Sequence, residues 1–388
     1  MRPTWIVLGV VVGLGAVAYV KLKSKADATP LARPVDEKAS ETPGAGATPP
    51  GRASTPGMEA SAPSSPTLAA PSGRSDATTA PEAEARAVVA SLNEKLAAND
   101  AAAVQGLEAR LWKDYGDTLE ARRYGLARAL VDARVALDDK QPLDGRIEAG
   151  LRARRGLSRA LFLPELFDPV TKRPTEARVT LRQTIASVNS LVMTKPGGVK
   201  DVTRPYDVAP GDNPLRIVSR EKLTCGPNAI LFWSQGGSLD PKRLKVGDRL
   251  LIPLETLSIH VSLERHLLGV YLGDVLVKEF EVGVGKASTP TFPGVYEVKD
   301  RYLNPDWHSP TGVIAYGDPR NELGDAWIPI ASAEKPKGYG IHGTNKPDTV
   351  GTDCSNGCVR LRNEEAVEMT SWVRTAKGEG QATRVHIR

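Results

Sequence analysis

The stretch that decides the fold class runs from residue 340 to residue 361 and reads GIHGTNKPDTVGTDCSNGCVRL. It holds Cys358, and a cysteine is a nucleophile in its thiolate form. His342 precedes it by sixteen residues, and an imidazole can take a thiol proton and later return it to a leaving amine. Gly357 permits close approach of the backbone, and Arg360 could hold a carboxylate or fix the loop. Because most buried cysteines are inert, this pair alone indicates catalysis only weakly.

The sequence around that stretch has the alternation of half-buried β-strands. Ile259, Val261 and Leu263 alternate with polar residues, and Gly269 and Gly273 stand at turn positions. Six motifs then follow in order: VGVGK at 282–286, TPTFPGVY at 289–296, NPDW at 304–307, NELG at 321–324, IHGT at 341–344 and SNGCVRL at 355–361. We expect a mostly β domain over 255–388.

These motifs together resemble the L,D-transpeptidase catalytic domain, the YkuD-like family. The resemblance implies a mostly β, sandwich-like fold and cysteine acyl transfer on peptidoglycan stem peptides. The bond before a terminal D-Ala is cut, and the acyl group passes to an amine. Carried over, Cys358 is the nucleophile, His342 is its base, and the N–H groups of Gly357 and Cys358 face the oxyanion. The implied oxyanion and substrate-binding residues are Gly357, Arg360, Ser355, Asn356 and Gly343, whose carbonyl orients the imidazole. The family commonly has histidine where this chain has Asn356, which predicts modified substrate handling.

A second, shorter resemblance covers residues 205–254. A Y-x-V-x-x-G-D opening at 206–212 and an L-x-x-G-D-x-L-x-I-P closing at 244–253 resemble the LysM module. That resemblance implies a small βααβ unit that binds N-acetylglucosamine-containing glycans of peptidoglycan. The implied glycan-binding residues are Gly211, Asp212, Leu215 and Ile230. The middle of the segment departs from the family, with an insertion around Trp233, so a scaffold that only packs on its neighbour is the alternative.

Residues 82–200 have the periodicity of helices. Apolar side chains recur at spacings of three and four, as in Leu119, Leu126 and Leu130. We expect four or five helices packed as hairpins, with no legible chemistry and an unidentified protein partner. The arginines at 152, 154, 155 and 159 form a cluster that we interpret as a solvated face.

The first 81 residues predict export rather than a folded domain. An apolar run from Trp5 to Val20 is followed by three lysines, and we interpret residues 1–25 as a membrane anchor or uncleaved signal. A cleaved signal and a buried core helix are the alternatives. Residues 26–81 are rich in Pro, Ala, Ser and Thr and predict a disordered linker. Together these features indicate the cell envelope, on the periplasmic side of the cytoplasmic membrane, with secretion after cleavage as the alternative.

Composition excludes several other function classes. The formal charge of the 388-residue chain is only +5, and the thin basicity argues against a nucleic-acid partner. Three cysteines are too few for a disulfide scaffold and lack paired zinc spacing, so we expect no metal and no cofactor. A zinc site built from His342, Cys354 and Cys358 is the alternative. Cys354 is either a packed thiol or the partner of Cys358 in a reversible oxidative lock.

Overall the sequence predicts a multidomain α+β protein with a helical N-terminal region, a LysM-like module and a YkuD-type catalytic domain. Two other functions stay open. The same site could let water resolve the acyl-enzyme, which would make it an L,D-carboxypeptidase. The chain could also be a catalytically silent peptidoglycan-binding protein.

Overall fold

The computed structural model describes residues 5–9, 19–23, 80–237, 239–333, 338–375 and 382–388. Near the N-terminus, β1 (Trp5–Gly9) and β2 (Tyr19–Lys23) form an antiparallel pair. Among the described residues, no helix has the length and apolar character needed to cross a membrane. Residues 1–4, 10–18 and 24–25 of the predicted anchor and 26–79 of the predicted linker lie outside the described residues.

Five α-helices follow, as the sequence predicts: α1 (Ala80–Ala97), α2 (Ala101–Tyr115), α3 (Leu119–Leu137), α4 (Leu143–Ala160) and α5 (Glu176–Met193). Short polar side chains begin three of them, because each oxygen accepts a free backbone N–H of the first turn. Asp100 begins α2, Thr118 begins α3 and Thr175 begins α5. Helices α3 and α4 pack closely through small residues, and a Cβ added to Gly156 would lie 2.7 Å from that of Ala129.

The C-terminal part is built on one nine-stranded sheet, so the β-rich prediction is confirmed. Its strand order is β16-β14-β13-β9-β17-β5-β6-β7, with β10 paired to β13. The strands are β5 (Leu257–Ser262), β6 (Leu267–Leu272), β7 (Val275–Glu281), β9 (Gly294–Val298), β10 (Tyr302–Leu303), β13 (Ala326–Ala331), β14 (Tyr339–His342), β16 (Val359–Arg360) and β17 (Arg384–Ile387). The last strand, β17, therefore lies inside the sheet, parallel to β5 and antiparallel to β9.

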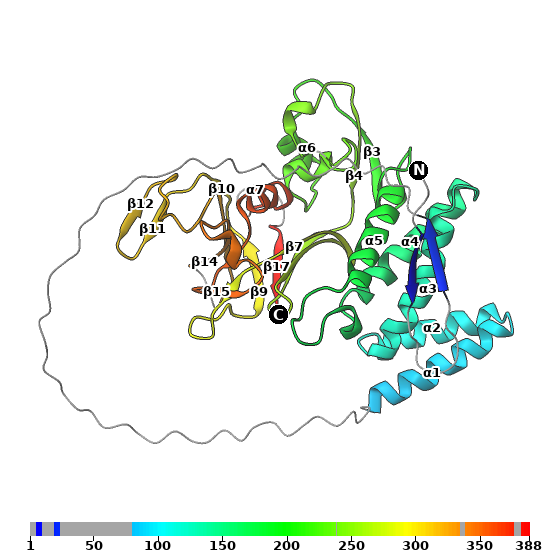
Figure 1. The fold of residues 1–388 in the computed structure, drawn as a ribbon. Coiled ribbons are helices and arrows are strands. Elements are labelled where there is room, and N and C mark those ends of the chain that lie inside the picture. Colours follow the sequence, from blue (N-terminus) through cyan, green and yellow to red (C-terminus); the bar gives the residue numbers. More distant parts are fainter. Residues whose placement is uncertain (1–4, 10–18, 24–79, 238, 334–337, 376–381) are drawn as a thin grey trace, which may run out of the picture.

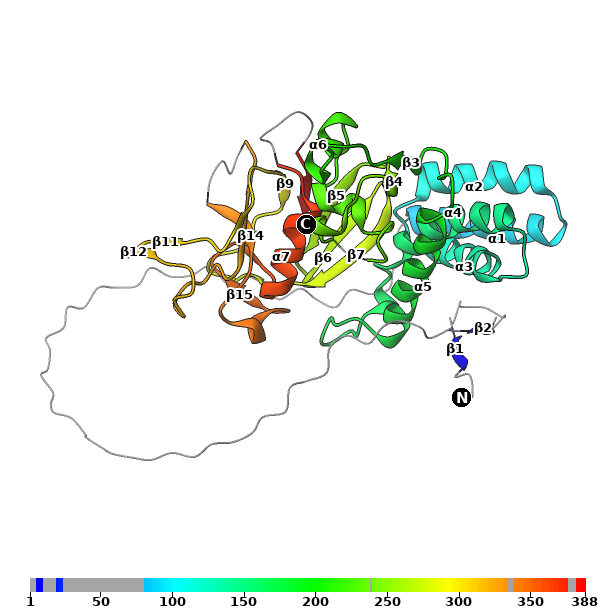
Figure 2. The same cartoon turned by 90° about the horizontal axis from the view of Figure 1, so that it is seen from above.

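Two smaller strand pairs complete this part. Strand β8 (Val284–Gly285) pairs in parallel with β15 (Asp353–Ser355), and β11 (Trp307–Ser309) forms a hairpin with β12 (Gly312–Ile314). The helices α1–α5 lie on one side of the sheet, and the β11–β12 hairpin projects on the opposite side (Figures 1 and 2).

The helices cover the free edge of β7, the outermost strand of the sheet. Leu276 donates its N–H to Ser158 Oγ at 3.1 Å and accepts from Asn189 Nδ2 at 2.9 Å. Such partners satisfy an edge that would otherwise be open to another chain. Arg178 also holds the Glu279 carboxylate with two hydrogen bonds of 2.8 and 2.6 Å, and both side chains are almost fully buried.

The basic cluster of α4 is part of this contact, which corrects the sequence interpretation of a solvated face. Arg154 is buried and forms an ion pair with Glu255, because α4 packs on the start of the C-terminal part. Arg159 forms an ion pair with Asp274 at 2.9 Å and stays partly exposed. Arg152 bonds to Asp132 on the neighbouring helix.

The segment that resembles LysM contains two antiparallel strands, β3 (Thr203–Asp207) and β4 (Arg249–Pro253). Between them lie α6 (Pro214–Arg220) and two 3₁₀ turns, η2 (Pro227–Leu231) and η3 (Pro241–Arg243). The second expected helix is thus a five-residue turn that begins at a Gly-Pro pair. A proline fits the first position of a helical turn, where its missing N–H costs no hydrogen bond.

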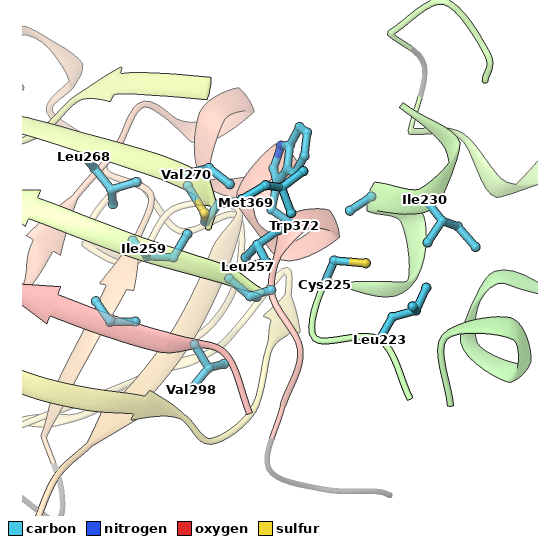
Figure 3. Close-up of a cluster of buried hydrophobic side chains, with 14 of the residues drawn as sticks. Leu223, Cys225, Ile230, Leu257, Ile259, Leu268, Val270, Val298, Met369 and Trp372 are labelled. Atoms are coloured by element: carbon cyan, nitrogen blue, oxygen red, sulfur yellow. The ribbon is translucent and has the colours of Figure 1, made fainter. Parts of the chain in front are cut away.

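This segment shares a hydrophobic core with the nine-stranded sheet (Figure 3). The connecting element is α7 (Asn363–Trp372), whose Trp372 is fully buried against Phe232 and Trp233. Gly226 donates its N–H to the Trp372 carbonyl at 2.7 Å. Figure 3 shows Cys225 between Leu257 and Trp372 on one side and Leu223 and Ile230 of the segment on the other. Residues on both sides of position 254 therefore bury one continuous core.

Candidate active site

A pocket of about 730 Å³ opens beside β14 and β16, the two strands at one edge of the nine-stranded sheet. Five of the residues predicted from the sequence line it: His342, Cys358, Arg360, Ser355 and Asn356. The opposite wall comes from the β10–β11 region, with Tyr302, Leu303, Asn304, Pro305, Asp306, Trp307 and His308. None of the predicted glycan-binding residues lies in this pocket.

The pairing of β14 with β16 brings the two reactive side chains together. The strands run parallel, with Ile341 opposite Val359 and His342 opposite Arg360. Ile341 and Val359 are buried in the core, so the alternate residues of both strands face the pocket. Cys358 comes immediately before β16 and therefore lies at the mouth of the same pocket.

The His342 imidazole is neutral in this arrangement. Its Nδ1 lies 2.6 Å from the carbonyl oxygen of Gly343, as predicted. Because a carbonyl only accepts hydrogen bonds, Nδ1 carries the proton and Nε2 keeps its lone pair. Burial, and secondarily the charge of Arg360, lowers the pKa of His342 to about 4, while the backbone of Gly343 and the Glu322 carboxylate act in the opposite direction.

Cys358 is held as a thiol. Burial raises the pKa of its thiol above the ordinary value of 9.0, and a hydrogen bond with the Gly340 backbone and the charge of Arg360 oppose that rise. Its Sγ–H donates to the carbonyl of Gly338 at 3.7 Å. Among the described residues no hydrogen bond joins Cys358 to His342, so the resting site contains two neutral groups in one pocket.

The loop before Cys358 is fixed by hydrogen bonds of its own. Gly357 has φ +119°, a conformation that side chains rarely adopt. Its N–H donates to Ser355 Oγ at 3.0 Å, and that hydroxyl donates to the Cys358 carbonyl at 2.6 Å. Contrary to the sequence prediction, the Gly357 N–H is therefore engaged inside the loop, and Ser355 shapes the turn. Thr291 Oγ1 holds the Gly357 carbonyl from the other side.

Arg360 is held by a carboxylate that the residue-by-residue analysis did not single out. Its Nη2 lies 2.7 Å from Glu322 Oε2, and Glu322 also pairs with Lys346. The Arg360 side chain is 7% exposed, and its buried Nε has no hydrogen-bond partner. Glu322 belongs to the NELG motif at 321–324, so this motif already indicated that a carboxylate could lie near the site.

The remaining cysteines stay outside the pocket. All three cysteines are free thiols. Cys354 does not line the pocket, and its Sγ lies so close to Gly283 that a Cβ there would approach it to 2.5 Å. This packing agrees with the interpretation of Cys354 as a packed thiol. The described residues contain no group of three or more His, Cys, Asp or Glu arranged to hold a metal ion.

The predicted glycan-binding residues divide into two groups. Leu215 is 58% exposed and Gly211 is exposed with φ +82°. Ile230 is 0% exposed in the shared core, so the prediction that its side chain meets a glycan is wrong. The Asp212 carboxylate accepts from Tyr206 Oη at 2.6 Å and from the Ala209 N–H at 2.9 Å, which makes it part of the loop's own framework.

The pocket of this β-rich domain therefore contains both a thiol, just before β16, and an imidazole, at the end of β14. The family model of the YkuD L,D-transpeptidase catalytic domain matches residues 257–387. The "Putative L,D-transpeptidase YkuD" of Bacillus licheniformis is 31% identical over 174 residues, which are 43% of this chain and 92% of that protein. The protein of the same name from Bacillus subtilis is 30% identical, with the same coverage. The chain therefore belongs to the YkuD L,D-transpeptidase family, and it is an acyltransferase.

A solved structure gives a weaker likeness. The catalytic domain of an Enterococcus faecium L,D-transpeptidase is 23% identical, with a TM-score of 0.26. The match covers 34% of this chain and 98% of that one.

Proposed function

We propose that this chain is a peptidoglycan L,D-transpeptidase that uses Cys358 as its nucleophile and His342 as its base. The observation that carries the proposal is the pairing of β14 with β16, which holds both side chains in one pocket. The neutral imidazole, with Nδ1 bound to Gly343, has Nε2 available for a proton. The family membership supports the same chemistry.

The reaction proceeds by two acyl transfers. His342 takes the Cys358 proton, and the thiolate attacks the carbonyl carbon before a terminal D-Ala of the stem peptide. The C–N bond then breaks, the imidazolium gives its proton to the leaving amine, and a thioester remains. An amine acceptor attacks the thioester, His342 takes the amine proton, and that proton returns to the Cys358 sulfur.

The oxyanion that forms in each step needs a donor. Since the Gly357 N–H is engaged with Ser355, we assign this role to the Cys358 N–H. Arg360 lies in the same pocket, and its positively charged guanidinium suits a carboxylate of the donor stem. Asn356 lines the pocket in place of the family's histidine and faces the substrate as a neutral amide.

The wider chain suits a substrate in the cell wall. We propose that the segment 205–254 contacts peptidoglycan glycan strands through the exposed Gly211 and Leu215. The protein would then act on the periplasmic side of the cytoplasmic membrane, where the predicted N-terminal anchor would hold it. Leu215→Asp in the full chain should reduce co-sedimentation with peptidoglycan, and Val246→Asp, an exposed apolar residue of the same segment, is the control.

Product analysis tests the proposed reaction. The full chain is incubated with a tetrapeptide stem ending in D-Ala, with and without an amine acceptor, and the products are weighed by mass spectrometry. We expect loss of D-Ala with transfer of the acyl group to the acceptor, and we expect Cys358→Ser to abolish both. Cys225→Ser is the matched control, because Cys225 lies buried in the core. A trimmed stem with no acceptor product identifies a carboxypeptidase, and an unchanged stem identifies a silent binding protein.

A further inference from the structure

The first residue of α7 lies directly behind the loop that carries His342. Asn363 Oδ1 accepts the Thr344 N–H at 2.9 Å and the Asp325 N–H at 3.3 Å. The backbone makes room for this amide with two glycines. A Cβ on Gly343 would lie 2.2 Å from Asn363 Oδ1, and one on Gly324 would lie 2.0 Å away. Any residue larger than glycine at position 343 or 324 would therefore collide with the Asn363 side chain.

The Thr344 N–H and the Gly343 carbonyl belong to the same peptide group. The carbonyl of that group takes the hydrogen bond from His342 Nδ1 at 2.6 Å. One planar unit therefore joins Asn363 to His342, with Asn363 Oδ1 on its N–H and the imidazole on its C=O. Because a peptide group is planar and stiff, fixing the N–H also fixes the direction of the carbonyl. A hydrogen bond on the N–H further polarises the carbonyl, which strengthens its bond to the imidazole.

We propose that Asn363 is a positioning residue that orients His342 through the Gly343–Thr344 peptide. The inference rests on the proposed function, in which His342 is the base. The Gly343 carbonyl occupies the place that the third residue of a catalytic triad takes beside the histidine, and Asn363 holds that carbonyl's peptide group from behind. Helix α7 supports the amide from the rear, because the helix is anchored in the shared core by Trp372.

Substitution of Asn363 gives opposite expectations for two variants. Asn363→Ala removes the acceptor and leaves the buried Thr344 backbone without its partner. We expect acylation of Cys358 by the donor stem to fall about tenfold to a hundredfold, carried by kcat rather than KM, because the base is misoriented. Asn363→Asp keeps an oxygen acceptor in the same place, and we expect it to stay within about threefold of the parent rate.

The pH profile separates positioning from a merely structural role. The charges that act on His342 are those of Arg360 and Glu322. The other titratable groups that line the pocket are Tyr302, Asp306, His308 and Cys358, and these variants change none of them. Asn363→Ala leaves the Gly343 carbonyl less polarised, so the imidazolium is less stable and the pKa of His342 falls. The acid limb of the acylation profile should therefore move to lower pH. Asn363→Asp should shift it to higher pH, because the new negative charge favours the imidazolium.

Histidine NMR gives a readout that does not depend on turnover. With ring-labelled histidine, the parent should show His342 as the Nδ1–H tautomer, and Asn363→Ala should weaken or broaden that Nδ1–H resonance. Asn213→Ala is the matched control, because Asn213 Oδ1 accepts the Arg216 N–H at 2.9 Å at the start of α6, remote from the pocket.

Two results would overturn the inference. The first is an unchanged His342 resonance and an unchanged acid limb in Asn363→Ala. The second is an Asn363→Asp enzyme as impaired as Asn363→Ala, with no upward shift. Either result leaves Cys358 and His342 as nucleophile and base, whereas acylation in Cys358→Ser would refute the proposed function itself.

Discussion

The resting site should contain a thiol beside a neutral imidazole, and raising the pH of the substrate-free enzyme tests this directly. The pKa of Cys358 lies above the ordinary 9.0 because the thiol is buried. At pH 7 the thiolate is therefore below about 1% of the population. The pKa of His342 is about 4, so at pH 7 only about 0.1% of the imidazole is charged. The charged pair is thus a minor form before substrate binds.

Alkylation by iodoacetamide measures the thiolate. The rate at Cys358 should rise about tenfold for each pH unit from 6 to 9, with no plateau in that range. Mass spectrometry of the peptide that contains Cys358 gives the rate, and Cys225 in the same digest is the internal control. Burial raises the pKa of Cys225 to about 12, so it should stay unlabelled in the folded chain.

The variant His342→Gln sharpens the test. Since the imidazole carries no charge at neutral pH, its loss should change the alkylation rate by less than about threefold. The same variant should lose acylation by the donor stem by about a hundredfold or more, because that step needs the base. A plateau of alkylation below pH 8 that His342→Gln removes would refute the reasoning, since it would reveal a thiolate–imidazolium pair.

Three further predictions concern stability. Arg178→Met should lower the free energy of unfolding in urea by about 3–5 kcal/mol, because Glu279 would stay buried with only Arg182 nearby. Adding Glu279→Leu to Arg178→Met should recover most of this loss. A double variant that loses as much stability as the two single variants added together would contradict the expectation. Trp372→Ala should cost about 3–5 kcal/mol and loosen residues 223–233 together with the sheet, and hydrogen exchange that changes in one part alone would count against the shared core. Burial lowers the pKa of His260 to about 4, so the unfolded chain takes up this proton at a higher pH than the folded chain does. The stability present above pH 6.5 should therefore decline as the pH falls toward 4. Urea midpoints measured at each pH should show a flatter decline in His260→Gln.

The sequence predicted well which residues line the pocket, because five of them stand in local motifs. His342 and Cys358 stand in two short motifs, and the alternation around Ile259 and Val261 indicated strands directly. The partners of the Gly357 N–H and of Arg360 depend on the path of the folded backbone instead. A motif shows that Ser355 and Glu322 are present, but not that one closes the turn and the other holds the arginine.

Contacts between distant segments were the part that sequence reasoning missed. The position of Ile230 in the LysM-like pattern predicted a glycan contact. Its side chain is instead buried in the core that includes α7, which begins more than 130 residues later in the chain. We interpreted Arg154 as part of a solvated face, yet its carboxylate partner, Glu255, lies about a hundred residues further along the chain, as does the Glu279 partner of Arg178. Local periodicity contains no information about such pairs, because they form only when two elements pack together.

The inner position of β17 makes assembly of the sheet depend on residues 384–387. Residues 384–387 pair with β5 on one side and β9 on the other, and the ribosome adds them after every other strand. Until they arrive, β5 and β9 each have an open edge, and the sheet that carries the nucleophile is interrupted in the middle. Such pairing between distant segments is slow to form. A chain whose residues 384–387 have not yet been synthesised therefore has its cysteine but no completed sheet around the pocket.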